Sequence, residues 1–331
     1  MNPIEASWSG RHALTFLLLP LTGAFCAVTA IRRWFYRLGW LRTQSLDVPV
    51  IIVGNITVGG TGKTPMVVWL ANKLLQQGYR PGIITRGYGG HSEEWPCEVT
   101  LESSARQVGD EAVLLKRRTR CPVYAGPDRP ATARRLLSQH TCDLIISDDG
   151  LQHYALERDL EIVVIDGKRR FGNGYCLPAG PLRESPERLT RADLVIVNGD
   201  AASGEYLMEV TGEQALALDG RRAPKMLADF SGATLHAVAG IGHPERFFGM
   251  LEAAGLKLER HPFPDHHDFC AADLAPFVSQ TVLMTEKDAV KCEPFAHPDH
   301  WYVPAAATVD PGFEKQLMVL IKRLEDGQKT A

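Results

Sequence analysis

A lysine and a threonine stand next to each other at Lys63 and Thr64, directly after a glycine-rich turn. The turn follows a short apolar, β-branched run at 48–53, which predicts a strand buried on both faces, and it precedes a segment at 66–75 with helical spacing. A strand, a flexible loop and a helix in this order form a phosphate cradle, because backbone N–H groups and the helix N-terminus point at anionic oxygens. The lysine reaches the β- and γ-phosphates and the threonine hydroxyl binds Mg²⁺. The sequence therefore predicts a nucleoside triphosphate site.

The loop departs from the general form of this motif. That form has a glycine at the position of Thr57, and Gly59 and Gly60 supply the backbone freedom instead. A glycine-rich turn ahead of an ordinary helix is the alternative, and the flanking strand and helix make it the weaker explanation. The expected nucleotide-binding residues are Asn55, Ile56, Thr57, Val58, Gly59, Gly60, Thr61, Gly62, Lys63 and Thr64.

Two adjacent carboxylates, Asp148 and Asp149, end a second apolar run that begins at residue 144. An apolar strand of this kind delivers a carboxylate to the Mg²⁺ held by Thr64. Two neighbouring aspartates would repel each other unless a cation or a hydrogen-bond donor compensates them. Gln152 follows closely and could orient the waters of the metal. A solvated turn is the alternative, which the nearby lysine–threonine loop disfavours.

The segment 262–268 places two histidines and two aspartates in one loop, with His266 and His267 adjacent. A histidine paired with a carboxylate could act as base on a hydroxyl, which demands less of a short loop than a metal site does. A plain surface loop remains the alternative. Asp110 opens a predicted helix, where an acidic residue is common as a partner of the helix dipole, and the pattern alone favours that structural role. Arg183 and Lys287 are further candidates for holding a phosphate.

The composition of the 331-residue chain is that of an ordinary globular protein, with 45% hydrophobic and 23% charged residues. A formal net charge of -3 offers no general attraction to nucleic acid. The seven cysteines form no C-x-x-C pair, which fits a reducing compartment and argues against a disulfide framework or a structural cysteine–zinc site. No obligate protein partner is evident.

The uncharged segment 13–31 is apolar and nearly long enough to cross a membrane. Arginines interleaved with aromatic residues follow it at 32–42, which is typical of an interface on the cytoplasmic leaflet. A signal peptide is disfavoured because the basic cluster comes after the apolar run, and a core helix of a soluble domain is the remaining alternative. We expect a membrane anchor, either shallow or spanning, with the rest of the chain cytoplasmic.

Strands and helices alternate from residue 48 to about 197, which predicts a mostly parallel sheet with its chemistry at the carboxyl ends of the strands. A break in composition at 219–224 suggests a boundary, and a smaller α/β unit follows it. We therefore expect an α/β protein of the P-loop NTPase type, with its sheet flanked by helices. Its parts are an N-terminal membrane-associated helix at 1–45, a kinase-like domain at 46–222 and a C-terminal domain at 223–331, whose last helix could pack back on the first domain.

Taken together, these motifs resemble the tetraacyldisaccharide 4′-kinases of lipid A biosynthesis. The resemblance covers nearly the whole chain, in order, and includes the variant loop with its paired glycines. Its segments are 54–65, 86–89, 108–111, 147–153, 177–184, 263–266 and 285–289.

The resemblance implies transfer of the γ-phosphate of ATP to the 4′-hydroxyl of a tetraacylated glucosamine disaccharide 1-phosphate, a lipid of the inner membrane. ATP and Mg²⁺ are the implied cofactors. It also reverses the interpretation of Asp110, which matches a catalytic carboxylate that works with a histidine. His266 is the expected partner, His267 stays open, and we expect closure of the domains on substrate to bring the pair together.

The remaining site residues follow from the same resemblance. Lys63 and Thr64 match the phosphate and Mg²⁺ ligands, and Lys63 is counted with the catalytic residues. The choice between the two aspartates as direct metal ligand stays open. The expected metal-side residues are Thr64, Asp148, Asp149, Gln152 and Glu184, and the substrate candidates are Arg86, Arg183 and Lys287. A P-loop switch or chaperone that hydrolyses nucleotide while acting on a protein partner is the competing hypothesis.

Overall fold

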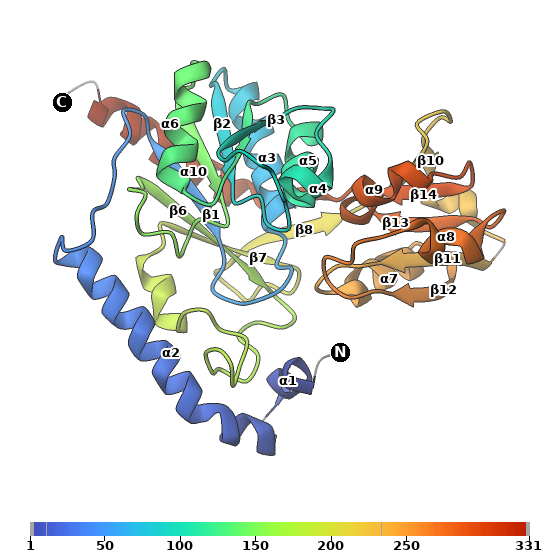
Figure 1. The fold of residues 1–331 in the computed structure, drawn as a ribbon, viewed down its shortest axis with the longest axis horizontal. Helices are drawn as coiled ribbons and strands as arrows, with labels where there is room; N and C mark the ends of the chain where they lie inside the picture. Colours follow the sequence, from blue (N-terminus) through green and yellow to red (C-terminus); the bar gives the residue numbers. More distant parts are fainter. Residues whose placement is uncertain (1–2, 11, 233, 329–331) are drawn as a thin grey trace.

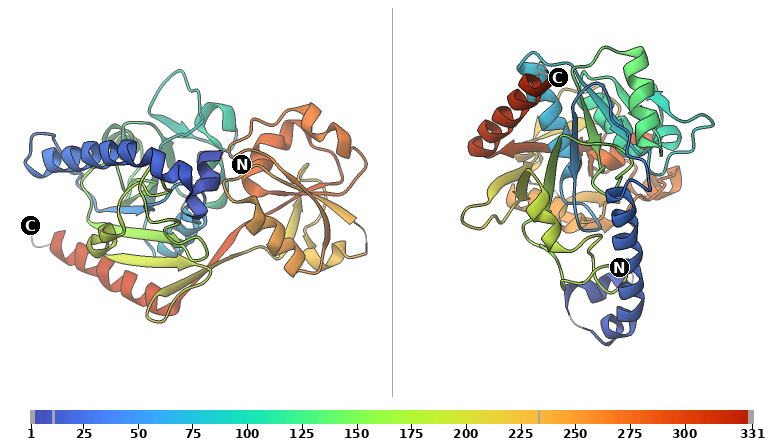
Figure 2. Two further views of the ribbon diagram at one scale, coloured as in Figure 1. Left: turned by 90° about the horizontal axis from the view of Figure 1, so that it is seen from below. Right: turned by 90° about the vertical axis from the view of Figure 1, so that its left-hand side faces the viewer.

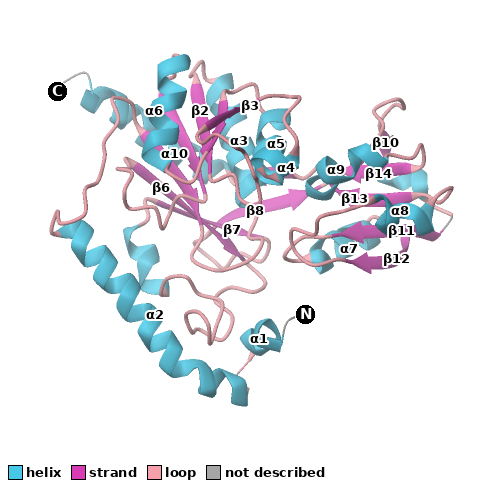
Figure 3. Cartoon of the chain, in the orientation of Figure 1, coloured by secondary structure: helices cyan, strands magenta, loops and turns pink. Residues whose placement is uncertain are grey.

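The computed structural model describes residues 3–10, 12–232 and 234–328. Its strands gather in two sheets that lie side by side (Figure 3), with the apolar N-terminal helix along the outside of the larger part (Figure 1). The chain crosses from the first sheet to the second between β8 (Tyr206–Thr211) and β9 (Gln214–Ala217), and it returns between β14 (His300–Val303) and β15 (Ala306–Val309). The first crossing lies a few residues before the boundary expected from composition.

The first sheet has nine strands in the order β15-β8-β7-β6-β1-β5-β2-β4-β3. Neighbours from β8 to β4 pair in parallel, whereas the edge strands β15 and β3 are antiparallel to theirs. The predicted mostly parallel sheet is therefore confirmed. Its other strands are β1 (Val50–Gly54), β2 (Pro81–Thr85), β3 (Cys97–Val99), β4 (Val123–Ala125), β5 (Leu144–Asp148), β6 (Leu160–Asp166) and β7 (Leu194–Asn198).

Helices cover both faces of this sheet. One face packs on α3 (Lys63–Gln76), α5 (Asp110–Arg118) and α10 (Pro311–Gln328), and the other packs on α6 (Arg129–Gln139). Alternate residues of β1 divide between the two cores: Ile51 lies in the first and Ile52 in the second, because successive strand side chains point to opposite faces. The last helix, α10, thus belongs to the core of the first sheet. Figure 2 shows it on the opposite side of the molecule from α2 (Ala13–Arg37).

The second sheet has six strands in the order β10-β9-β14-β13-β11-β12. Its central strands are parallel, and β9 and β10 add an antiparallel edge. The remaining strands are β10 (Lys225–Met226), β11 (Thr234–Ala239), β12 (Lys257–Pro262) and β13 (Val282–Thr285), and the helices are α7 (Pro244–Ala253), α8 (Ala271–Leu274) and α9 (Glu286–Cys292). Short helical turns complete the chain: α1 (Pro3–Ala6), α4 (Ala105–Val108), η1 (Ser7–Ser9), η2 (Pro186–Arg191), η3 (Leu227–Phe230), η4 (Ala275–Phe277) and η5 (Glu293–Phe295).

Candidate active site

The phosphate loop lies between β1 and α3, as the sequence predicts, but the helix begins at Lys63 rather than at residue 66. Gly62 makes this early start possible, because it caps the helix with a left-handed φ of 97°. A Cβ on Gly62 would lie 2.4 Å from Asn198 Nδ2, so the close approach of β7 also requires glycine here. Lys63 is thereby the first helical residue. The backbone N–H groups of the first turn, which have no partner within the helix, lie beside the loop.

Two side chains outside the loop hold its backbone in shape. Asn198, the last residue of β7, donates from Nδ2 to the carbonyl of Thr61 at 2.9 Å. Arg169 donates from Nη2 to the carbonyl of Gly60 at 2.8 Å. Because these carbonyls are held from outside, the loop conformation does not depend on its own side chains alone. Neither residue is marked by a sequence motif, although the position of Asn198 at the end of a buried strand was a usable signal.

Asp148 ends β5 next to the phosphate loop, since its strand partner on β1 is Val53. Its side chain is 1% exposed, and neither carboxylate oxygen has a hydrogen-bond partner among the described residues. Burial, together with the charges of Glu111 and Asp149, raises its pKa to about 7, although Lys63 opposes the shift. A buried carboxylate without a donor is costly unless a cation or a proton neutralises it.

Asp149 has the opposite electrostatics although it is the next residue. Its Oδ1 lies 3.6 Å from Lys63 Nζ, and both of its oxygens lie 3.0 Å from Arg183 Nη1. Burial alone would raise the pKa of Asp149, but Lys63 and Arg183 outweigh it and lower the pKa to about 2. Asp149 is therefore ionised near neutral pH, where Asp148 is only partly ionised. In this structure Lys63 and Arg183 are both engaged by the same acidic side chain.

Asp110, the first residue of α5, and His266, in the loop after β12, come together from the two domains. His266 Nδ1 lies 3.2 Å from Asp110 Oδ2. Burial would raise the pKa of Asp110, but the hydrogen bond from His266 and the charges of Lys287 and Lys291 outweigh it and lower the pKa. An ionised carboxylate only accepts hydrogen bonds, so Nδ1 of His266 carries the proton. The pair is already formed in this structure, and closure of the domains is not needed to assemble it.

The second nitrogen of His266 faces a lysine. Lys287 Nζ lies 3.3 Å from His266 Nε2 and 3.2 Å from Glu111 Oε1. Burial would lower the pKa of Lys287, but Glu111 and Asp110 outweigh it and raise the pKa, so its ammonium donates and Nε2 accepts. Lys287, expected as a phosphate ligand, is thus a direct neighbour of the candidate base. The neighbouring His267 faces elsewhere, with Nε2 3.0 Å from Asp273 Oδ2.

Glu184 is surrounded by donors. Its Oε1 accepts from Gln152 Nε2 at 3.0 Å, and its Oε2 accepts from Tyr154 at 2.8 Å and from Arg33 Nη1 at 3.1 Å. Gln152 also donates to the carbonyl of Asn55 in the phosphate loop at 3.1 Å. The two residues therefore connect the loop to the N-terminal helix. These donors occupy the oxygens with which Glu184 would bind a metal.

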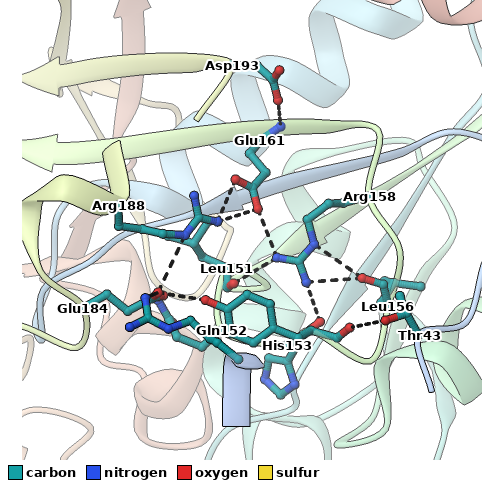
Figure 4. Close-up of polar contacts among 12 residues, drawn as sticks. Thr43, Leu151, Gln152, His153, Leu156, Arg158, Glu161, Glu184, Arg188 and Asp193 are labelled. Atoms are coloured by element: carbon teal, nitrogen blue, oxygen red, sulfur yellow. Dashed lines mark hydrogen bonds and ion pairs between the residues drawn. The ribbon is translucent and has the colours of Figure 1, made fainter. Parts of the chain in front are cut away.

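Further ion pairs, which involve Arg188, Glu161 and Arg158, support Glu184 (Figure 4). Arg188 Nε lies 3.6 Å from Glu184 Oε2, and its Nη2 lies 2.6 Å from both oxygens of Glu161. Arg158 Nη1 donates to the same Glu161 at 3.1 Å. Because Arg188 and Glu161 are buried, removing one partner would leave the other charge uncompensated. This network therefore holds the Glu184 side chain in one position.

The N-terminal helix α2 docks on the first domain by one side. Thr22 Oγ1 donates to the carbonyl of Cys176 at 3.2 Å and accepts from the amide of Ala179 at 3.0 Å. The opposite side exposes large apolar side chains, and only 11% of the most apolar window of the helix is buried. By length and composition α2 is able to cross a membrane. Its exposed apolar residues include Phe16, Leu17, Leu21, Val28 and Ile31.

These elements surround one cavity of about 760 Å³. Residues 58–64 of the phosphate loop form one wall, and Arg32 and Arg33 of α2 contribute another. Arg86, the remaining substrate candidate, also lines it, as does His266 from the second domain. A Cβ on Gly242 would lie 3.2 Å from the amide nitrogen of Gly60, so the second domain closely approaches the phosphate loop. The cavity thus adjoins the predicted phosphate loop, His266 and the apolar surface helix α2.

Fold and loop together define the class: an α/β protein of the P-loop NTPase type with an appended second domain. Residues 14–322 match the family model described as "Tetraacyldisaccharide-1-P 4'-kinase". The chain belongs to this family.

Individual relatives agree with the family match. The chain is 51% identical over 317 residues to a tetraacyldisaccharide 4'-kinase of Nitrosococcus oceani, covering 96% of this chain and 93% of the relative. It is 50% identical to a tetraacyldisaccharide 4'-kinase of Methylobacillus flagellatus, covering 97% of this chain and 96% of the relative. Among solved structures it is similar to the "apo" form of LpxK from Aquifex aeolicus in complex with ATP. The TM-score is 0.78 and the identity 29%, and the match covers 94% of this chain and 99% of the other.

Proposed function

We propose that this protein transfers the γ-phosphate of ATP to the 4′-hydroxyl of a tetraacylated glucosamine disaccharide 1-phosphate. The product would be the 4′-phosphorylated lipid A precursor. The main support for this proposal is that the phosphate loop, His266 and the polar side of α2 line the same cavity. A lipid acceptor has to meet ATP where an apolar surface and a phosphate cradle adjoin, because its acyl chains stay in the bilayer.

Asp110 and His266 would handle the proton of the acceptor hydroxyl. The carboxylate holds Nδ1–H at 3.2 Å, which leaves Nε2 as the basic nitrogen. In the reaction the hydroxyl would take the place that Lys287 Nζ now occupies beside Nε2. Lys287 would then shift toward Glu111, and its positive charge would stay near the transferring phosphoryl group. Positioning and charge neutralisation account for most of the catalysis expected of such a site.

Mg²⁺ fits the residues on the nucleotide side. Asp148 offers two buried oxygens without a hydrogen-bond donor, and the Thr64 hydroxyl stands at the start of α3. Oxygen ligands of this kind suit Mg²⁺, which would neutralise charge on the β- and γ-phosphates. We propose Thr64 and Asp148 as its protein ligands. Asp149, Gln152 and Glu184 would shape the surroundings, since each is already engaged by neighbouring donors or acceptors.

The arginines of the cavity would hold the phosphates. Arg86, Arg33 and Arg183 line it beside the phosphate loop. Arg183 contacts Asp149, and Arg33 contacts Glu184, so both are pre-oriented by a carboxylate. Guanidinium groups suit phosphate because their planar fork donates two parallel hydrogen bonds. We assign Arg86 and Arg33 to the 1-phosphate of the lipid and Arg183 to the nucleotide side.

The N-terminal helix would lie in the interface of the inner membrane, with the catalytic domains on the cytoplasmic face. Thr22, near the middle of α2, and Arg33, near its C-terminal end, hold the helix against the first domain, whereas the opposite side is apolar and exposed. A helix that spans the bilayer could not keep these side contacts to a water-soluble domain. A flat position places the cavity at the level of the lipid headgroups.

The decisive experiment is incubation of the purified protein with γ-labelled ATP, Mg²⁺ and the disaccharide 1-phosphate lipid in detergent, followed by identification of the labelled product. Label on the 4′-oxygen of the lipid is the expected result. ATP hydrolysis without lipid phosphorylation would instead support the competing P-loop switch, which none of the relatives' names favours. Asp110→Asn should lower lipid phosphorylation, whereas Glu102→Gln, at an exposed carboxylate outside the cavity, should leave it as in the wild type.

A further inference from the structure

Two histidines and a glutamate converge on one face of the second sheet. His236 lies on β11, and Glu259 and His261 lie on the neighbouring edge strand β12. The strands are parallel, and His236 is the register partner of Glu259. Glu259 and His261 are two positions apart on a strand, so they share a face with each other and with His236. The sheet pairing itself therefore creates the cluster.

The distances within the cluster suit a small metal ion. His236 Nδ1 lies 3.0 Å from His261 Nε2 and 3.4 Å from Glu259 Oε2, and one ligand atom from each residue lies within 4.8 Å of the others. Ligand atoms around a tetrahedral zinc ion are roughly 3.3 Å apart, given bonds of about 2.0 Å. The distance from His236 Nδ1 to Glu259 Oε2 agrees with this value. On zinc binding, His236 Nδ1 and His261 Nε2 would move apart by a few tenths of an ångström.

We propose that His236, Glu259 and His261 form a binding site for a zinc-like divalent ion, with an open fourth position for water. Two imidazoles and one carboxylate are an established ligand set for zinc, whereas Mg²⁺ prefers oxygen ligands only. The phenyl ring of Phe277 supports the geometry, because its centroid lies 5.1 Å from the ring of His236 and 4.6 Å from that of His261. This packing restricts the rotation of both imidazoles.

The site is separate from the cavity described above, because none of the three ligands is among the described residues that line it. It has a structural connection to that cavity, however. His261 is the penultimate residue of β12, and the loop with His266 follows directly. A bound ion would join the edge strand to β11 and stabilise the strand from which this loop departs. The inference does not depend on the proposed kinase function.

The test uses the full-length, untagged protein after treatment with a chelator. Zn²⁺ is titrated calorimetrically in the presence of excess Mg²⁺, which occupies oxygen-only sites. We expect one tightly bound Zn²⁺ per chain, and Co²⁺ in its place should give the absorption of a low-coordinate nitrogen–oxygen site. His261→Ala should weaken binding at least ~100-fold. Zinc should also raise the Tm of the wild type and leave that of His261→Ala unchanged.

Glu259→Gln is the second variant, because its side chain is 60% exposed and the substitution keeps its shape, so the fold is preserved. It should weaken zinc binding ~10-fold or more. His91→Ala, which removes an exposed histidine elsewhere, is the matched control and should bind as the wild type does. Absence of zinc binding by the wild type, or equal binding by all variants, would show that the two histidines share only a hydrogen bond.

Discussion

Lys291 Nζ lies 3.7 Å from Asp110 Oδ2, although Lys291 belongs to α9 of the second domain and Asp110 begins α5 of the first. The same ammonium lies 3.3 Å from Asp288, which is fully buried. Asp288 in turn accepts a hydrogen bond from the amide of Gly240 at 2.8 Å, and the carbonyl of Gly240 accepts one from the amide of His266 at 3.2 Å. Lys291 thus connects the candidate catalytic carboxylate to the backbone that positions its histidine.

Lys291→Met should lower kcat ~10-fold or more and change the pH profile. Lys291 is one of the charges that lower the pKa of Asp110, so its removal should raise that pKa. Because Asp110 must be ionised to hold Nδ1–H, the acidic limb of the kcat profile should move to higher pH. Lys315→Met, an exposed lysine on α10, is the control. An unchanged acidic limb would mean that Lys291 has only a structural role.

Asp110→Ala and His266→Ala should each lower kcat much more than they raise the KM for ATP. The double variant should be little worse than the worse single variant, because residues that act as a unit are not additive. Steady-state kinetics of the three proteins provides the measurement. His267→Ala is the matched control, and it should stay near wild type because His267 pairs with Asp273. Fully multiplicative losses would indicate independent roles.

Lys63→Ala should reduce lipid phosphorylation by ~10²-fold or more, since it removes the charge that we propose stabilises the transferring phosphoryl group. Circular dichroism and the Tm should show a folded protein. Lys322→Ala, at an exposed lysine of α10 that does not line the cavity, controls for loss of a positive charge. A folded Lys63→Ala protein with near wild-type turnover would contradict the assignment of the ATP site.

The substitution Asp148→Asn should stabilise the protein relative to wild type, and by more at alkaline than at acidic pH. The pKa of Asp148 is about 7 in the fold and 3.8 for an ordinary aspartate, so the folded state binds the extra proton between these values. Its destabilising charge is absent below about pH 4, grows as pH rises, and is complete above pH 7. The Tm difference from wild type should therefore be larger at pH 8 than at pH 4.5.

Mg²⁺ gives an independent readout at the same residue. It should raise the Tm of the wild type at pH 8, and this increase should be smaller for Asp148→Asn. Asp47→Asn, an exposed aspartate, should respond to both pH and Mg²⁺ as the wild type does. Equal stabilisation of all three proteins by Mg²⁺ would remove Asp148 from the proposed ligands.

Charges placed on the exposed face of α2 should release the protein from membranes. Leu17 and Leu21 are 74% and 59% exposed, so a Leu17→Glu/Leu21→Glu variant should keep its fold. It should sediment less with vesicles of anionic phospholipid than the wild type does. Leu101→Glu, at a leucine that is 61% exposed elsewhere, should sediment normally. Truncation before Trp34 should have the same effect as the double variant, and a wild type that stays soluble beside vesicles would exclude the anchor.

Local patterns in the sequence were enough for the nucleotide side of the site. The strand, glycine loop and helix around Lys63 are consecutive, and the parallel sheet places the end of β5 beside the end of β1. Alternation of apolar segments therefore predicted both the cradle and the position of Asp148, because neighbouring parallel strands end at the same edge. The apolar run of α2 was also visible, because its residues are consecutive in the sequence.

Contacts between distant segments were decided by the tertiary structure. Asp110 and His266 are 156 positions apart, and sequence pattern alone favoured a helix-start role for Asp110 until the family resemblance reversed it. Packing of the two domains also selects His266 over His267 and brings Lys291 to Asp110. Opposite pKa shifts at the adjacent Asp148 and Asp149 depend on burial and on nearby cations, which the order of residues does not encode locally. Periodicity specifies elements, whereas charge states and pairings arise only once those elements pack.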